Sequence, residues 1–105
     1  METIPSKQYL KIKARYPDFL NAVEILGKTI KQEGPIDNKT AQLVQLAAAA
    51  SVRSEGAVHS HTKRAINAGA QDEEIYHTLI LLTSTIGFPN VMAALSWAED
   101  VIENS

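Results

Sequence analysis

The chain has 105 residues, of which 45% are hydrophobic and 21% are charged, and it contains no cysteine. This length predicts one domain over residues 1–105. A formal net charge of −2 offers no basic surface for nucleic acid, and without cysteine the chain has no disulfide, thiolate metal ligand or thiol redox cycle. No apolar stretch reaches the roughly 20 residues that span a bilayer, and the N-terminal residues contain no signal-peptide core. We therefore expect a cytoplasmic protein without a membrane partner.

Proline and glycine divide the sequence into helix-length segments whose hydrophobic spacing is helical. Phe19, Val23, Leu26 and Ile30 fall at i, i+4, i+7 and i+11, and the same spacing recurs in residues 75–86 and 91–102. No segment alternates with period two over the length of a strand. The sequence therefore predicts an all-α fold of about six helices, at residues 6–14, 17–33, 38–52, 55–68, 72–86 and 89–103.

The fifth predicted helix is apolar on every side at residues 79–82, Leu-Ile-Leu-Leu. A helix that is apolar all round must be covered all round, and a chain of this size has little material to cover it. We therefore predict a subunit interface at this helix. The alternative is a central helix wrapped entirely by its own chain.

The segment 53–61 contains two histidines but no sequence signal for a metal or for a nucleophile. His59 and His61 are two residues apart and point to opposite sides of a helix, so they cannot chelate one ion together. We expect no metal site. Ser54 precedes His61 by seven residues, about 10.5 Å of helix, which is too far for a catalytic pair. Ser54 is instead predicted to be a helix N-cap, followed by Glu55 in the first turn.

The hydrophobic spacing of residues 55–68 predicts that His61 faces the interior of the protein. It shares a stripe with Val58, Ala65 and Ala68, and the small residues leave space beside the imidazole. Two interpretations stay open, a hydrogen-bonded core histidine and the acid–base group of a small pocket.

The other two histidines are predicted to lie nearer the surface. His59 belongs to a more exposed side of its helix, where it can pair with Glu55 or lie beside Lys63. His77 shares its helix with two glutamates and is predicted to lie at the surface.

The run from residue 50 to residue 98 resembles the carboxymuconolactone decarboxylase family of the AhpD-like superfamily. The features that carry the resemblance are His61-x-x-x-Ala-x-x-Ala-Gly-Ala-x-Asp-Glu-Glu-Ile and the later turn Gly87-Phe88-Pro89. The resemblance covers the chain from Asp37 onward, and the N-terminal third matches only as generic helices. It implies an AhpD-like helical bundle that assembles as a homo-oligomer, a trimer or a hexamer.

The peroxidase branch of the superfamily uses a Glu, a Cys-x-x-Cys pair and a His that is separated from the second Cys by three intervening residues. The resemblance maps these positions onto Gln42, Ser54, Ala57 and His61, and the histidine is the one that is retained. A serine hydroxyl cannot form a sulfenic acid or a disulfide. Thiol peroxidase activity is therefore excluded.

The decarboxylase branch lacks the cysteine pair and has a histidine at the position of His61. This resemblance implies a cofactor-free decarboxylase or related lyase that acts on a small carboxylated lactone, with His61 as the proton donor. Arg53 or Arg64 would anchor the substrate carboxylate, and Gln42 and Ser54 would complete the substrate-binding set in a pocket between the third, fourth and fifth helices. The alternative is a non-catalytic family member that binds a small molecule or a partner.

Overall fold

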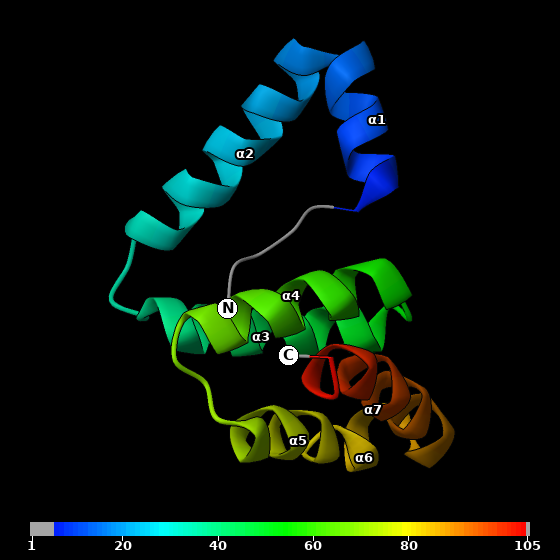
Figure 1. The fold of residues 1–105 in the computed structure, drawn as a ribbon. Helices are drawn as coiled ribbons and strands as arrows, with labels where there is room; N and C mark the ends of the chain where they lie inside the picture. The colour runs from blue at the N-terminus through cyan, green and yellow to red at the C-terminus, as the bar shows by residue number, and fades with distance from the viewer. Residues whose placement is uncertain (1–5, 105) are drawn as a thin grey trace. The chain divides into compact units, whose positions relative to one another are not determined.

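The computed structural model describes residues 6–104, in which every regular element is helical (Figure 1). The predicted all-α fold is confirmed. The chain divides between Asp37 and Asn38 into two compact units. The first contains α1 (Lys7–Arg15) and α2 (Pro17–Gln32), and the second contains α3 (Asn38–Ser51), α4 (Glu55–Asn67), α5 (Asp72–Ile80), α6 (Thr83–Ile86) and α7 (Phe88–Ile102).

The first unit is a pair of helices joined at Tyr16. Pro17 occupies the first turn of α2, where a missing N–H costs no hydrogen bond. Glu24 of α2 accepts hydrogen bonds from the hydroxyl of Tyr9 and from the ammonium of Lys13, the latter at 3.0 Å. These polar contacts connect α2 to α1, and Leu20 is the buried residue of the longer helix.

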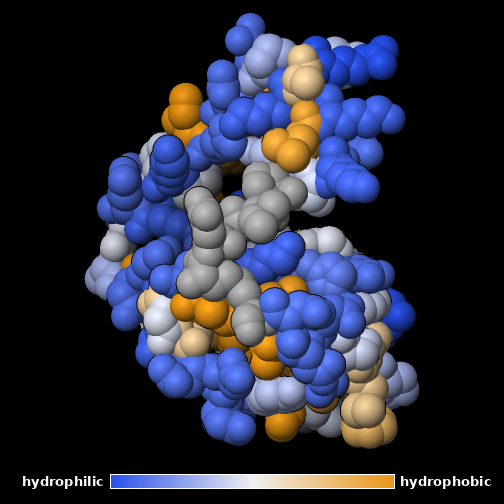
Figure 2. Space-filling model, in the orientation of Figure 1, coloured by the Kyte–Doolittle hydropathy of each residue, from blue (hydrophilic) through white to orange (hydrophobic). Residues whose placement is uncertain are grey.

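The hydrophobic stripe of α2 lies at the surface. Its helical spacing is confirmed, but four of its side chains are 45–61% exposed, namely Phe19, Val23, Leu26 and Ile30. On the face of the molecule drawn in Figure 2, hydrophilic side chains predominate and hydrophobic ones emerge in separate groups.

The second unit holds the hydrophobic core. Figure 1 shows α3 beside α4, and α7 packs against both α4 and α5. Leu46, Val58, Ile75 and Leu79 are completely buried. Alanines fill the remaining core positions and allow the helices to approach closely, namely Ala49, Ala50, Ala65, Ala94 and Ala98.

The predicted fifth helix, residues 72–86, is interrupted in the structure. It forms α5 and the four-residue α6, separated by a turn at Leu81 and Leu82. The hydroxyl of Thr83 donates to the carbonyl of Ile80 at 2.7 Å, a side-chain bond that competes with the helical ladder. Leu79 points into the core, whereas Ile80 and Leu81 are 51% and 62% exposed.

Two glycines sit where the chain must turn with positive φ. Gly69 follows the end of α4 with φ 99°, and Gly87 precedes α7 with φ 90°. Only glycine adopts this backbone region without steric cost. Within residues 6–104, no helix has both the length and the apolar character that a membrane crossing requires.

Candidate functional site

The structure brings together two of the predicted site residues, Gln42 of α3 and His61 of α4. His61 is half-buried and Gln42 is 4% exposed, and the Nδ1 of His61 lies 3.0 Å from the Oε1 of Gln42. The Nε2 of Gln42 donates to the Oδ1 of Asn38 at 3.5 Å, which orients the amide so that its oxygen faces the imidazole. Because an amide oxygen only accepts, Nδ1–H of His61 is the donor.

This hydrogen bond assigns one ring nitrogen of His61 to Gln42. The Nδ1–H is engaged with Gln42 in both the neutral ring and the imidazolium. Any proton transfer to a bound molecule would therefore use Nε2. A ring oriented in this way has the geometry of a group that transfers protons through one defined atom.

The environment of His61 follows the predicted stripe. Val58 and Ala65 are completely buried and Ala68 is half-buried, so this side of α4 faces inward as expected. The pattern did not single out Thr62, which is also completely buried. Its Oγ1 has no hydrogen-bond partner among the described residues.

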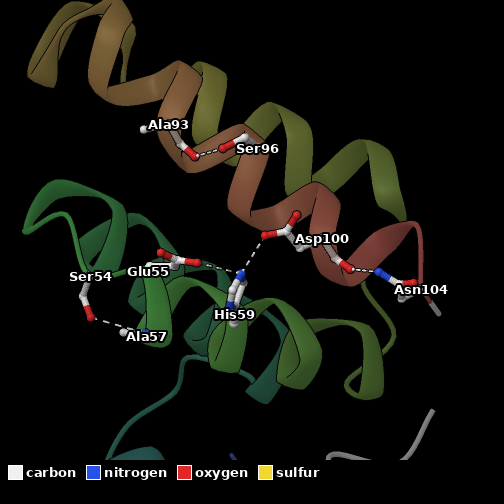
Figure 3. Close-up of polar contacts among 8 residues, drawn as sticks. All are labelled: Ser54, Glu55, Ala57, His59, Ala93, Ser96, Asp100 and Asn104. Atoms are coloured by element: carbon white, nitrogen blue, oxygen red, sulfur yellow. Dashed lines mark hydrogen bonds and ion pairs between the residues drawn. The ribbon is translucent and has the colours of Figure 1, made fainter.

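Ser54 is the N-cap of α4, as predicted. Its Oγ accepts a hydrogen bond from the backbone N–H of Ala57 at 3.3 Å (Figure 3). This N–H lies in the first turn of α4, where backbone N–H groups have no partner within the helix. The hydroxyl proton of Ser54 is not used by this bond.

The two arginines of the predicted site lie in the turn before α4 and on α4 itself. Arg53 is exposed in the turn between α3 and α4 with φ 56°, and its guanidinium donates to the side-chain oxygen of Asn90 on α7. Arg64 is exposed on α4, three residues after His61, which places the two side chains on neighbouring positions of one helix face.

A second polar cluster surrounds His59, on the opposite side of α4 from His61. Its Nε2 lies 3.9 Å from the Oε2 of Glu55, one of the two neighbours expected from the sequence, and 3.0 Å from the Oδ2 of Asp100 on α7 (Figure 3). Asp100 follows His59 by 41 residues, and no sequence signal linked them. Beside this cluster lies an open surface cavity of about 310 Å³.

The fold of the second unit and its hydrogen-bonded glutamine–histidine pair define a helical protein with a candidate acid–base site. Residues 17–100 match the model of the carboxymuconolactone decarboxylase family. The chain belongs to this family, and the match extends through α2, beyond the region that carried the resemblance in the sequence.

The chain is also similar to two individual proteins, of which the second is named as a member of this family. The uncharacterized protein MJ1511 of Methanocaldococcus jannaschii is 31% identical over 94 residues, which cover 90% of this chain and 88% of that protein. The crystal structure of apo-lpg0406, a carboxymuconolactone decarboxylase family protein from Legionella pneumophila, is 25% identical with a TM-score of 0.79. This likeness covers 91% of this chain and 86% of that one.

Proposed function

We propose that the protein is a cofactor-free carboxy-lyase for a small carboxylated lactone, with His61 as the proton donor. The hydrogen bond between Nδ1 of His61 and Oε1 of Gln42 is the observation that carries the proposal. It supports a ring that is held in one orientation and exchanges protons at Nε2. Gln42 then acts as a positioning residue, through His61.

The reaction needs one proton at carbon. Loss of CO₂ breaks the bond between the carboxyl carbon and the lactone, and the electron pair remains on the substrate as an enolate. The imidazolium of His61 gives the Nε2 proton to the enolate carbon and becomes neutral. The Nδ1–H of His61 stays hydrogen-bonded to Gln42 throughout. A proton from solvent then restores the imidazolium.

The substrate carboxylate requires a cationic anchor. Arg64 is our first choice, because it lies one helical turn beyond His61 and an arginine can hold a carboxylate through two parallel hydrogen bonds. Arg53 is the second choice, since its guanidinium already donates to Asn90. Ser54 would donate its hydroxyl proton to the substrate while its oxygen caps α4.

The proposal is tested by following the turnover of 4-carboxymuconolactone by ultraviolet absorbance. We expect turnover by the wild type and by His77→Ala, which removes an exposed histidine from α5. We expect His61→Ala to lose turnover while retaining its helical circular dichroism. A folded wild type without turnover would exclude this substrate, and a fully active His61→Ala would exclude the assigned proton donor.

The same hydrogen bond is also consistent with one alternative function. In that alternative, the protein is a non-catalytic family member that binds a small molecule or a partner. A half-buried histidine satisfied by a buried glutamine is also an ordinary structural pair. In this alternative, His61→Ala lowers the free energy of unfolding by about 1–3 kcal/mol, because the polar atoms of Gln42 lose a partner. Wild type then shows no turnover.

We also propose a homo-oligomer, a trimer or a hexamer, as the functional state. Ile80 and Leu81 support this assembly because they expose two large apolar side chains in succession at the end of α5. Exposed apolar groups of this kind mark surfaces that become covered on association.

A further inference from the structure

We propose that Glu55, His59 and Asp100 form a binding site for a divalent transition-metal ion, of which Zn²⁺ is the best fit. The site joins α4 to α7 and lies on the opposite side of α4 from His61. It is independent of the proposed lyase function. It also departs from the sequence-based expectation of no metal site, which considered His59 together with His61.

The first support is the convergence of three ligand atoms (Figure 3). Glu55 and His59 are separated by four residues, so both side chains lie on one face of α4. Asp100 approaches the same nitrogen from α7, 3.0 Å from Nε2 of His59. One ligand atom from each of the three residues lies within 4.8 Å of the other two.

These separations are close to those that a tetrahedral ion requires. Zinc bonds of about 2.0–2.2 Å place neighbouring ligand atoms about 3.3–3.6 Å apart in a tetrahedron. The 3.0 Å separation of His59 from Asp100 is a little shorter than this ligand spacing, and the 3.9 Å separation of His59 from Glu55 is a little longer. A small movement of each carboxylate would therefore bring the ligand atoms to the spacing that zinc requires. The side chains of Glu55 and Asp100 are each 59% exposed, so both carboxylates can make that movement.

The second support is the balance of charge and space around the imidazole. Two carboxylates face His59, whereas Lys63, one turn further along α4, is the cation that lines the adjoining cavity of about 310 Å³. The cluster therefore has an excess of negative charge. The cavity leaves room for the water molecules that would complete the coordination of an ion with three protein ligands.

The ligand chemistry selects the class of ion. One imidazole nitrogen with two carboxylate oxygens suits first-row divalent ions, and zinc accepts this mixture without a strict geometric demand. Calcium and magnesium take oxygen ligands almost exclusively, so the central imidazole disfavours them. Co²⁺ is the spectroscopic probe for the same site, because its visible absorption reports coordination number.

The test is a calorimetric titration of the purified protein with ZnCl₂, repeated with CoCl₂ under visible absorbance. We expect one ion per chain, and at least about tenfold weaker binding by His59→Ala and by Asp100→Asn. His77→Ala, the matched histidine control, should bind as the wild type does. Lys63→Gln should bind more tightly, because it removes the cation that lines the adjoining cavity.

Two results would overturn the site. One is the absence of a saturable heat change with wild type, and the other is equal zinc affinity in wild type, His59→Ala and Asp100→Asn. Asp100→Asn retains the shape of the side chain, so it is informative even where His59→Ala is poorly folded. His61→Ala should retain zinc binding whether or not it retains turnover, which separates this inference from the proposed function.

Discussion

The Nδ1 of His61 on α4 lies 3.0 Å from the Oε1 of Gln42 on α3, whereas the neighbouring His59 presents its Nε2 to Asp100 at the same distance. An amide oxygen and a carboxylate are both acceptors, so each ring donates through a different nitrogen. Two histidines on one helix are therefore held in opposite tautomers when they are neutral. The difference arises from their partners on separate helices.

These tautomers are a direct prediction. In the neutral state, we expect the nitrogen chemical shifts of His61 to report Nδ1–H and those of His59 to report Nε2–H. Gln42→Leu should remove the preference of His61 and leave the shifts of His59 unchanged. A neutral His61 with its proton on Nε2 would contradict the assigned orientation of the Gln42 amide.

Thr62→Val should stabilise the protein. The hydroxyl of Thr62 is completely buried without a partner among the described residues, and valine has nearly the same shape without the polar atom. We expect a gain of about 1 kcal/mol in the free energy of unfolding, measured by urea denaturation. Thr78→Val is the matched control, because that hydroxyl donates to the carbonyl of Glu74 at 2.7 Å and should give no gain. A destabilised Thr62→Val would contradict the assignment of an unsatisfied group.

Acid should weaken the contact of α5 with α3 through Glu74. A hydrogen bond from the backbone N–H of Gln71, and then the ammonium of Lys39 at 3.0 Å, lower the pKa of Glu74 below its ordinary value of 4.5. Since the folded pKa lies below the unfolded one, the ionised carboxylate stabilises the fold above the unfolded pKa. This contribution is lost as the pH falls through the folded pKa.

The variant that tests this contribution is Glu74→Gln. We expect it to be less stable than the wild type at pH 7, with a difference that shrinks as the pH falls below 4.5, in urea titrations at a series of pH values. Glu73→Gln removes the same charge from the preceding position and should lose less stability at pH 7. A pH-independent difference for Glu74→Gln would be inconsistent with the lowered pKa.

Ser54→Ala should destabilise the start of α4. Alanine cannot accept the hydrogen bond from the N–H of Ala57, and the loss of such a cap costs about 1 kcal/mol. Ser54→Asp should retain most of the stability, because aspartate also caps helices and its charge suits an N-terminus. Thermal and urea unfolding followed by circular dichroism measure both. Equal losses in the two variants would point to a role of the hydroxyl other than capping.

Leu81→Glu should reduce the size of the assembly. Leu81 is 62% exposed next to Ile80, and a charge there would resist burial between subunits. Light scattering coupled to size-exclusion chromatography should show a smaller species than wild type. Ser96→Glu introduces the same charge at an exposed polar position of α7, and it should retain the wild-type mass. A monomeric wild type at micromolar concentration would contradict the predicted interface.

Local signals predicted most of the helices. The 3.6-residue period at Val58, His61 and Ala65 identified the inward side of α4, and Ser54 marked its first turn, because both features depend on residues within a few positions of one another. The interruption at Leu81 escaped prediction, since the apolar period continues across it. The bond from Thr83 to Ile80 appears only when the turn has formed.

The sequence by itself determined the all-α fold, the family and the exclusion of thiol chemistry, since these follow from composition, periodicity and a motif within one stretch of chain. Tertiary structure decided which groups meet: Gln42 with His61 across 19 residues, and Asp100 with His59 across 41. The physical reason is that these contacts depend on how α3 and α7 pack against α4. Helical periodicity predicts which side of a helix is buried. Which neighbouring helix covers that side depends on the packing of the whole core.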